Sequence, residues 1–276
     1  ETLDSIDPEV QKLIHLEEER QVRKLILIPS ESTAPLCVRT SLSSVFQNLY
    51  AEGYPPEEMS AQTEEELLNY EEQLSRYRRY SDPRYYKGVE FVDILESLTK
   101  RRCAELFCNN LIKAENLFVN VQALSGAPAN NAVYDALITP GTTIMGMDLF
   151  HGGHLSHGSP VNRSGKLYHA VHYSVDARTE LLDYAQILEQ AKQDHPQIII
   201  CGYSSYPWVP DWQEFRKIAD AVGAYMFADI SHIAGLIAAG VVPSPVGIAD
   251  VITFTTHKTL CGPRGACIIT KDATLA

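Results

Sequence analysis

Short apolar runs alternate with helical stretches along the second half of the chain, and this alternation is the feature that most constrains the fold. Strands that alternate with helices form βαβ units, in which neighbouring strands run parallel and helices cover both faces of the sheet. The sequence therefore predicts an α/β fold with a mostly parallel sheet sandwiched by helices. The expected strands are 117–121, 143–145, 198–201, 224–227, 251–254 and 266–269, and the expected helices among them are 129–137 and 212–222.

The first half of the chain has helical patterns. Asp7 and Pro8 predict the start of an N-terminal helix that ends before Pro29, because Asp caps a helix and Pro suits its first position. Apolar residues spaced three and four apart predict an amphipathic helix over 91–107.

Residues 56–83 differ in composition from their surroundings. Pro56 and Pro83 bracket a stretch dense in Glu and Arg, which is typical of a surface helix. We therefore divide the chain into an N-terminal arm and helix at 1–48 and a large domain at 49–276. The large domain is expected to carry an inserted helical excursion at 56–83, outside the catalytic core.

Charge and cysteine usage exclude several classes of protein. With 35 acidic and 23 basic residues the formal net charge is -12, which argues against nucleic acid as a partner. No apolar stretch approaches the roughly 20 residues of a membrane helix, and no secretory signal is visible. The six cysteines form no CxxC pair, which favours reduced thiols. These features predict a cytoplasmic protein with no nucleic-acid or membrane partner.

Residues that follow the expected strands are the candidates for chemistry, because ligands of parallel sheets bind beyond the carboxyl ends of the strands. Ser125 and Gly126 lead into a helix, whose free N–H groups and dipole suit a phosphate. Taken alone, this pair is better explained as an ordinary helix cap.

An acid and a lysine follow two later runs. Asp229 could hold a protonated pyridine nitrogen, although capping of the next helix is the simpler alternative. Lys258 lies among hydroxyls and beside His257, where a lowered pKa would let its free amine attack an aldehyde. A lone lysine is usually a solvated cation. The order of phosphate turn, acid and lysine therefore carries more weight than any one of them.

Longer motifs stand in a defined order along the chain: YAEGYP at 50–55, a run rich in glycine and histidine at 147–166, DISHIAGLIAAG at 229–240 and TTHKTLCGPRG at 255–265. In these motifs the chain resembles the serine hydroxymethyltransferase family of fold-type I pyridoxal-phosphate-dependent transferases. The resemblance implies reversible transfer of a one-carbon unit between serine and tetrahydrofolate, giving glycine and 5,10-methylenetetrahydrofolate. It also implies a homodimer, or a tetramer, with shared active sites.

The resemblance implies roles for residues around pyridoxal 5'-phosphate. Lys258 matches the lysine that binds the cofactor covalently, and His257 matches its catalytic neighbour. Asp229 matches the partner of the pyridine nitrogen. The other implied positions are Ser125 and Gly126 at the phosphate, His232 and Ser204 beside the phenolic oxygen, a catalytic His151 stacked on the ring, and Arg264 and Tyr50 near the cofactor.

The resemblance also implies residues for the substrates. Ser30 matches a serine that binds the substrate carboxylate, with a helix cap as the alternative, and Glu52 matches a carboxyl group that handles a proton. Tyr50 and Tyr86 match aromatic residues donated across the dimer interface.

Three histidines recur at every third position over 151–157, a spacing that could suggest a metal site. Gly152 and Gly153 argue against a helix that would align them, so no metal is predicted.

The chain departs from the family pattern at the phosphate turn. Ala127 and Pro128 stand where the family has Ser and Gln, which removes one hydroxyl donor and one N–H, and Ser32 replaces an Asn. The resemblance further implies a C-terminal small domain beyond these 276 residues, so the isolated segment is expected to be inactive. Two alternatives stay open: a catalytically silent remnant that binds cofactor or dimerises, and another fold-type I enzyme such as an aldolase or aminotransferase.

Overall fold

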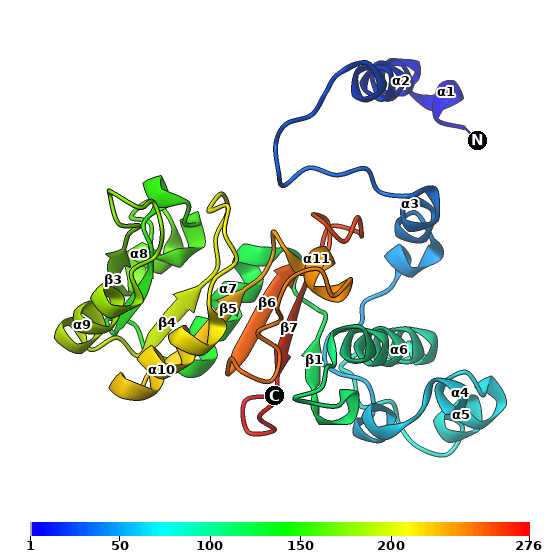
Figure 1. Ribbon diagram of the computed structural model, residues 1–276. Coiled ribbons are helices and arrows are strands. Elements are labelled where there is room, and N and C mark those ends of the chain that lie inside the picture. The colour runs from blue at the N-terminus through cyan, green and yellow to red at the C-terminus, as the bar shows by residue number, and fades with distance from the viewer. Residues whose placement is uncertain (1) are drawn as a thin grey trace.

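The computed structural model describes residues 2–276, which include a seven-stranded sheet (Figure 1). The strand order is β1-β7-β6-β5-β4-β2-β3. β7 pairs antiparallel with both neighbours, whereas the other pairs are parallel. The predicted mostly parallel α/β sheet is therefore confirmed. The strands are β1 (Phe118–Asn120), β2 (Thr143–Met147), β3 (His169–Tyr173), β4 (Ile198–Cys201), β5 (Tyr225–Asp229), β6 (Val251–Thr255) and β7 (Ala266–Thr270).

Helices cover both faces of the sheet because its central strands are apolar on both sides. In β4, Ile199 and Cys201 pack in one cluster with side chains of α10 (Trp212–Val222), whereas Ile198 and Ile200 pack in another with side chains of α7 (Gly126–Leu137). A strand buried on both faces reads as a continuous apolar run, which is why β4 was predictable. The other helices of this region are α6 (Glu90–Phe107), α8 (Arg163–Leu167), α9 (Tyr184–Asp194), α11 (Ala234–Ala238), η3 (Ala114–Asn116), η4 (Leu149–His151) and η5 (Leu155–His157).

Helix α9 and strand β3 were not among the predicted elements. β3 lies at one edge of the sheet, where it pairs only with β2. Its residues are mostly half-buried, so the strand lacks the apolar run that marks a central strand. At its carboxyl end, β5 extends two residues beyond the predicted boundary at Phe227 and so includes Asp229.

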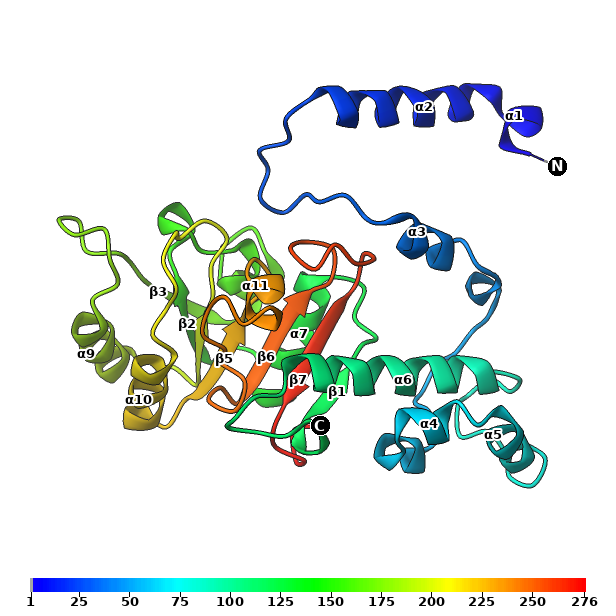
Figure 2. The same cartoon turned by 45° about the vertical axis from the view of Figure 1, so that its right-hand side comes forward.

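The N-terminal arm buries none of its helical side chains in the described chain. The backbone N–H of Val10 donates to the Asp7 side chain at 3.0 Å, so α2 (Pro8–Arg23) begins as predicted and ends before Pro29. Figures 1 and 2 show that α2 lies away from the sheet. Its other elements are α1 (Leu3–Ile6), α3 (Leu36–Leu42) and η1 (Val45–Asn48). Across residues 2–276, no helix combines the length and apolar character needed to cross a membrane.

Residues 56–83 fold into short helices outside the sheet core: η2 (Glu57–Ala61), α4 (Glu64–Leu67) and α5 (Tyr70–Tyr77). Thr63 and Glu66 form a capping box that begins α4. Met59 and Leu67 are buried in a small apolar cluster with Ile94 of α6. The segment is therefore helical, and it is anchored to the large domain by packed side chains.

Gly202, which directly follows β4, lies against the end of β5. A Cβ at this position would lie 2.0 Å from the carbonyl oxygen of Asp229. We expect Gly202→Ala to destabilise the chain by about 3 kcal/mol in urea denaturation, because the backbones of the two strands must move apart. Gly223→Ala is the control: φ there is +68° and no atom lies within 4 Å of the added Cβ. The free energy of unfolding of that variant should fall by only about 1 kcal/mol. Equal losses in the two variants would show that the close approach of Gly202 to Asp229 does not cause the larger effect.

Candidate active site

A pocket of about 350 Å³ opens at the carboxyl ends of the parallel strands. This is the edge at which ligands of open α/β sheets bind. Loops after β5 and β6 and the N-terminus of α7 contribute most of its wall. The lining residues are Ser30, Glu31, Ser125, Gly126, Ala127, His154, His157, Tyr203, Ser204, Asp229, Ser231, His232, Thr255, His257, Lys258 and Arg264.

Asp229 ends β5 and is held by four polar contacts. Ser231 donates to Oδ1 through its backbone N–H at 3.1 Å and through its hydroxyl at 2.6 Å. Asn130 donates to Oδ2 at 2.9 Å, and the Nε2 atom of His157 lies 3.0 Å from the same oxygen. Burial raises the pKa of Asp229, but these partners, led by His157, outweigh it and hold the pKa well below its usual range. The carboxylate is therefore ionised at neutral pH.

Asn130, on α7, links Asp229 to two other parts of the site and was missed from the sequence. Its amide also donates to the Ser156 hydroxyl at 2.8 Å, and its carbonyl accepts from the Thr253 hydroxyl at 2.7 Å. The side chain is fully buried. A polar residue on the apolar face of a helix was the available signal, since buried amides need partners.

Lys258 follows β6, is buried, and lines the pocket. Burial lowers the pKa of its ammonium, although the Asp229 charge acts in the opposite direction. Its Nζ lies 3.2 Å from Nε2 of His232. Burial, with the nearby Lys258 charge, lowers the pKa of His232 to about 4. His232 is therefore neutral at pH 7, and more of Lys258 is a free amine than in an exposed lysine.

The start of α7 leaves donor groups open to the pocket. Ser125 is the N-cap residue, yet its hydroxyl makes no capping hydrogen bond. A Cβ on Gly126 would lie 2.9 Å from the Thr255 methyl group, so this close approach requires glycine. Pro128, in the first turn, provides no N–H. The turn thus presents a hydroxyl and backbone N–H groups at a helix N-terminus, with one donor fewer than a non-proline turn.

The other predicted residues near Lys258 are also brought together. Ser204, His257 and Arg264 line the pocket with it. Burial, followed by the Arg264 charge, lowers the pKa of His257. Ser30 reaches the pocket from the N-terminal arm, where the Ser32 hydroxyl donates to the carbonyl of His257 at 3.1 Å.

His151 does not line the pocket, in contrast to its expected position on the cofactor ring. Its Nδ1 instead accepts from the backbone N–H of Val175 at 3.2 Å. Gly152 has φ +113°, a left-handed turn that separates His151 from the histidines after it. His154 and His157 line the pocket in its place, and burial lowers the pKa of His154 to about 4. The glycines after His151 predicted that no helix aligns the three histidines, but they did not predict which of the histidines enters the pocket.

Tyr50, Glu52 and Tyr86 also lie outside this pocket in the single chain. The two tyrosine rings pack with centroids 5.6 Å apart, and both side chains are exposed. Glu52 is exposed as well. Their expected role across a dimer interface stays a prediction. Among residues 2–276, no three His, Cys, Asp or Glu side chains converge as metal ligands.

The pocket fits a ring that carries an aldehyde, a basic ring nitrogen and a phosphate. A lysine with a lowered pKa, an ionised carboxylate and a helix N-terminus face one cavity. Two buried polar atoms of its wall, Nδ1 of His157 and the Thr255 hydroxyl, have no hydrogen-bond partner within the described chain. Buried polar atoms of this kind are normally satisfied, so a polar ligand would complete the site.

The mostly parallel sheet, with helices on both faces and a pocket at its carboxyl edge, is that of a fold-type I domain. The chain matches the family model described as serine hydroxymethyltransferase over residues 3–80 and 75–275, and it belongs to that family. The serine hydroxymethyltransferase of Methanosarcina barkeri is 48% identical over 274 residues. That alignment covers 99% of this chain and 58% of the relative, so the chain spans little more than half of the relative's length. The two family matches meet at 75–80, inside the 56–83 segment.

Proposed function

We propose that this chain binds pyridoxal 5'-phosphate and forms the cofactor-binding part of a serine hydroxymethyltransferase. The proposed reaction moves the hydroxymethyl carbon of serine to tetrahydrofolate and leaves glycine and 5,10-methylenetetrahydrofolate. The observation that carries the proposal is the convergence of Lys258 and Asp229 on one pocket with unsatisfied polar atoms. Family membership and the 48% identity to a serine hydroxymethyltransferase support it.

Each part of the pocket has a proposed task. Lys258 would hold the cofactor through its aldehyde carbon, with the aldehyde oxygen leaving as water, since the lowered pKa of this lysine favours the nucleophilic free amine. Asp229 holds the protonated ring nitrogen, and Ser125 with Gly126 binds the phosphate. When bound, the cofactor supplies an electron sink for the amino acid's α-carbon. The remaining cofactor contacts are proposed for His154 at the ring face, in place of His151, for His232 and Ser204 at the phenolic oxygen, and for His257 and Arg264.

The substrate side of the site is proposed to need a second copy of the chain. Ser30 lines the pocket and is proposed to bind the serine carboxylate. Glu52, Tyr50 and Tyr86 are proposed to enter from the partner copy of a homodimer or tetramer, because they are exposed and do not line this pocket in their own chain. All six cysteines are free thiols, which supports a reducing, cytoplasmic setting.

The test of the proposed activity is an assay of serine cleavage with tetrahydrofolate. The assay uses the natural-length protein, which is the polypeptide in which these residues occur. We expect formation of methylenetetrahydrofolate, and we expect Lys258→Ala to abolish it. For the isolated 276-residue chain we expect no turnover, because it spans only 58% of the serine hydroxymethyltransferase that it matches. Transamination of aspartate in place of serine cleavage would favour the aminotransferase alternative. A natural-length protein that binds cofactor but turns over neither substrate would favour the silent remnant.

A further inference from the structure

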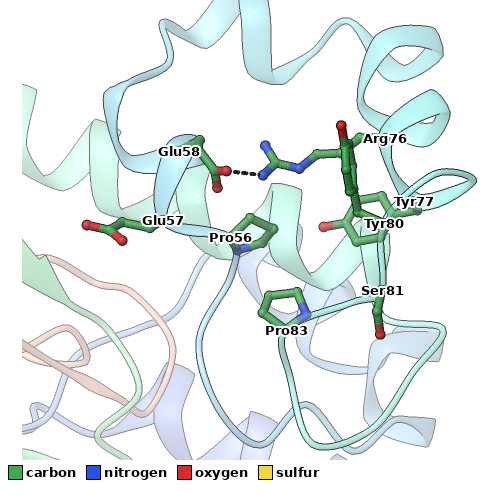
Figure 3. A pocket seen from close by; sticks show the side chains of 8 residues that line it. All are labelled: Pro56, Glu57, Glu58, Arg76, Tyr77, Tyr80, Ser81 and Pro83. Carbon is green, nitrogen blue, oxygen red and sulfur yellow. Dashed lines mark ion pairs between the residues drawn. The ribbon is translucent and has the colours of Figure 1, made fainter.

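The 56–83 segment reaches the interior of the large domain through Tyr77, at the end of α5. Figure 3 shows Tyr77 beside Tyr80 and Arg76, in a hollow that Pro56 and Pro83 border. The Tyr77 hydroxyl donates to Oδ2 of Asp93 at 2.6 Å. Asp93 lies on α6 and is fully buried. The contact therefore joins the segment to a buried charge of the large domain.

Asp93 in turn holds Arg84, which is also buried. The Nε of Arg84 donates to Oδ1 of Asp93, and Nη2 donates to Glu96 at 2.7 Å. Nη1 donates to the carbonyl oxygens of Ala51 at 2.6 Å and Gly53 at 2.9 Å. All three nitrogens of the guanidinium are thus occupied.

Those two carbonyls flank Glu52, and its own carbonyl oxygen accepts from the backbone N–H of Tyr85 at 3.1 Å. The backbone of Glu52 is consequently fixed on both sides and at its centre. We call Arg84 with the carbonyls of Ala51 and Gly53 the Arg84 clamp. The Glu52 side chain itself stays exposed, so the clamp orients it without covering it.

We propose that Tyr77 is a positioning residue for Glu52, acting through Asp93 and the Arg84 clamp. Without the Tyr77 hydroxyl, Oδ2 of Asp93 loses its only hydrogen-bond partner within residues 2–276. A buried carboxylate then gains by engaging the guanidinium with both oxygens, since Arg–carboxylate pairs favour bidentate geometry. That shift draws Arg84 away from the carbonyls of Ala51 and Gly53. The 56–83 segment thereby helps to hold Glu52 in place, in addition to its packing on α6.

The positioning role of Tyr77 depends on the proposed function in one respect: Glu52 must act in proton transfer. Tyr77→Phe tests it, with Tyr80→Phe as the matched control, because Tyr80 borders the same hollow and is 67% exposed. The first readout is amide hydrogen exchange at Tyr85, whose N–H reports on the Glu52 carbonyl. We expect about tenfold faster exchange in Tyr77→Phe, and wild-type exchange in Tyr80→Phe. Exchange at Ile199 of β4 should stay unchanged, which separates local loosening from global destabilisation.

The second readout is serine cleavage by the natural-length protein. We expect kcat to fall about tenfold in Tyr77→Phe while the KM for serine stays unchanged, since orientation of a proton-transfer group is lost. Wild-type exchange at Tyr85 in Tyr77→Phe, or the same acceleration in Tyr80→Phe, would overturn the proposal. The exchange readout needs no cofactor or turnover. An inactive wild-type protein would therefore contradict the proposed function. Amide hydrogen exchange at Tyr85 would still test the role of Tyr77.

Discussion

Replacing Arg84 with methionine is expected to destabilise the folded chain by about 3–5 kcal/mol. Its guanidinium is buried and makes contacts with Asp93, Glu96 and the carbonyls of Ala51 and Gly53. Without it, Asp93 remains as a buried carboxylate whose one remaining hydrogen-bond partner among residues 2–276 is the Tyr77 hydroxyl. An uncompensated buried charge costs far more than the loss of an exposed ion pair.

Urea denaturation of the 276-residue chain measures this effect, with Arg163→Met as the control. Arg163 pairs with Asp135 at 3.1 Å, but their side chains are 50% and 49% exposed. Exposed pairs of this kind contribute about 1 kcal/mol or less. If the two variants lost similar free energies of unfolding, burial would not make the Arg84 contacts more stabilising than an exposed ion pair.

Replacing Asp229 with asparagine is expected to weaken pyridoxal-phosphate binding about 10- to 100-fold. A neutral amide cannot stabilise a protonated ring nitrogen as a carboxylate does. The new side chain also carries an NH₂ group in place of one of the two carboxylate oxygens of Asp229. A side chain that now donates to that oxygen, such as Asn130 or Ser231, would then face another donor. Both effects lower the affinity for the cofactor.

An absorbance titration with the cofactor measures the affinity, and Asp272→Asn serves as the control. Asp272 is an exposed carboxylate near the end of the chain, so that variant should bind as the wild type does. Unchanged affinity in Asp229→Asn would mean that this carboxylate does not contact the ring nitrogen.

The central sheet could be predicted because its strands are buried on both faces. In β4 every side chain is apolar and fully buried, so the sequence and the structure carry the same pattern. β3 lacks that signal because it lies at an edge. The anchoring of residues 56–83 could not be predicted either. Composition marked the segment as helical, but the contact of Tyr77 with Asp93 joins positions 16 residues apart through tertiary structure.

The site was predictable where topology fixes it. Lys258 and Asp229 follow or end parallel strands, and such residues meet at one edge of the sheet whatever the side chains around them. Local geometry was not predictable in the same way. The turn at Gly152 decides which histidine enters the pocket, and Asn130 becomes part of the site only because α7 packs against β6.

Covalent mapping of the cofactor tests whether Lys258 is the lysine that bonds to it. The chain is incubated with pyridoxal 5'-phosphate, reduced with borohydride, digested and analysed by mass spectrometry. We expect one pyridoxyl group per chain, on Lys258, because this lysine is buried in the pocket and its pKa is lowered by burial. A label on exposed Lys166 or Lys271, or on no lysine at all, would contradict the account.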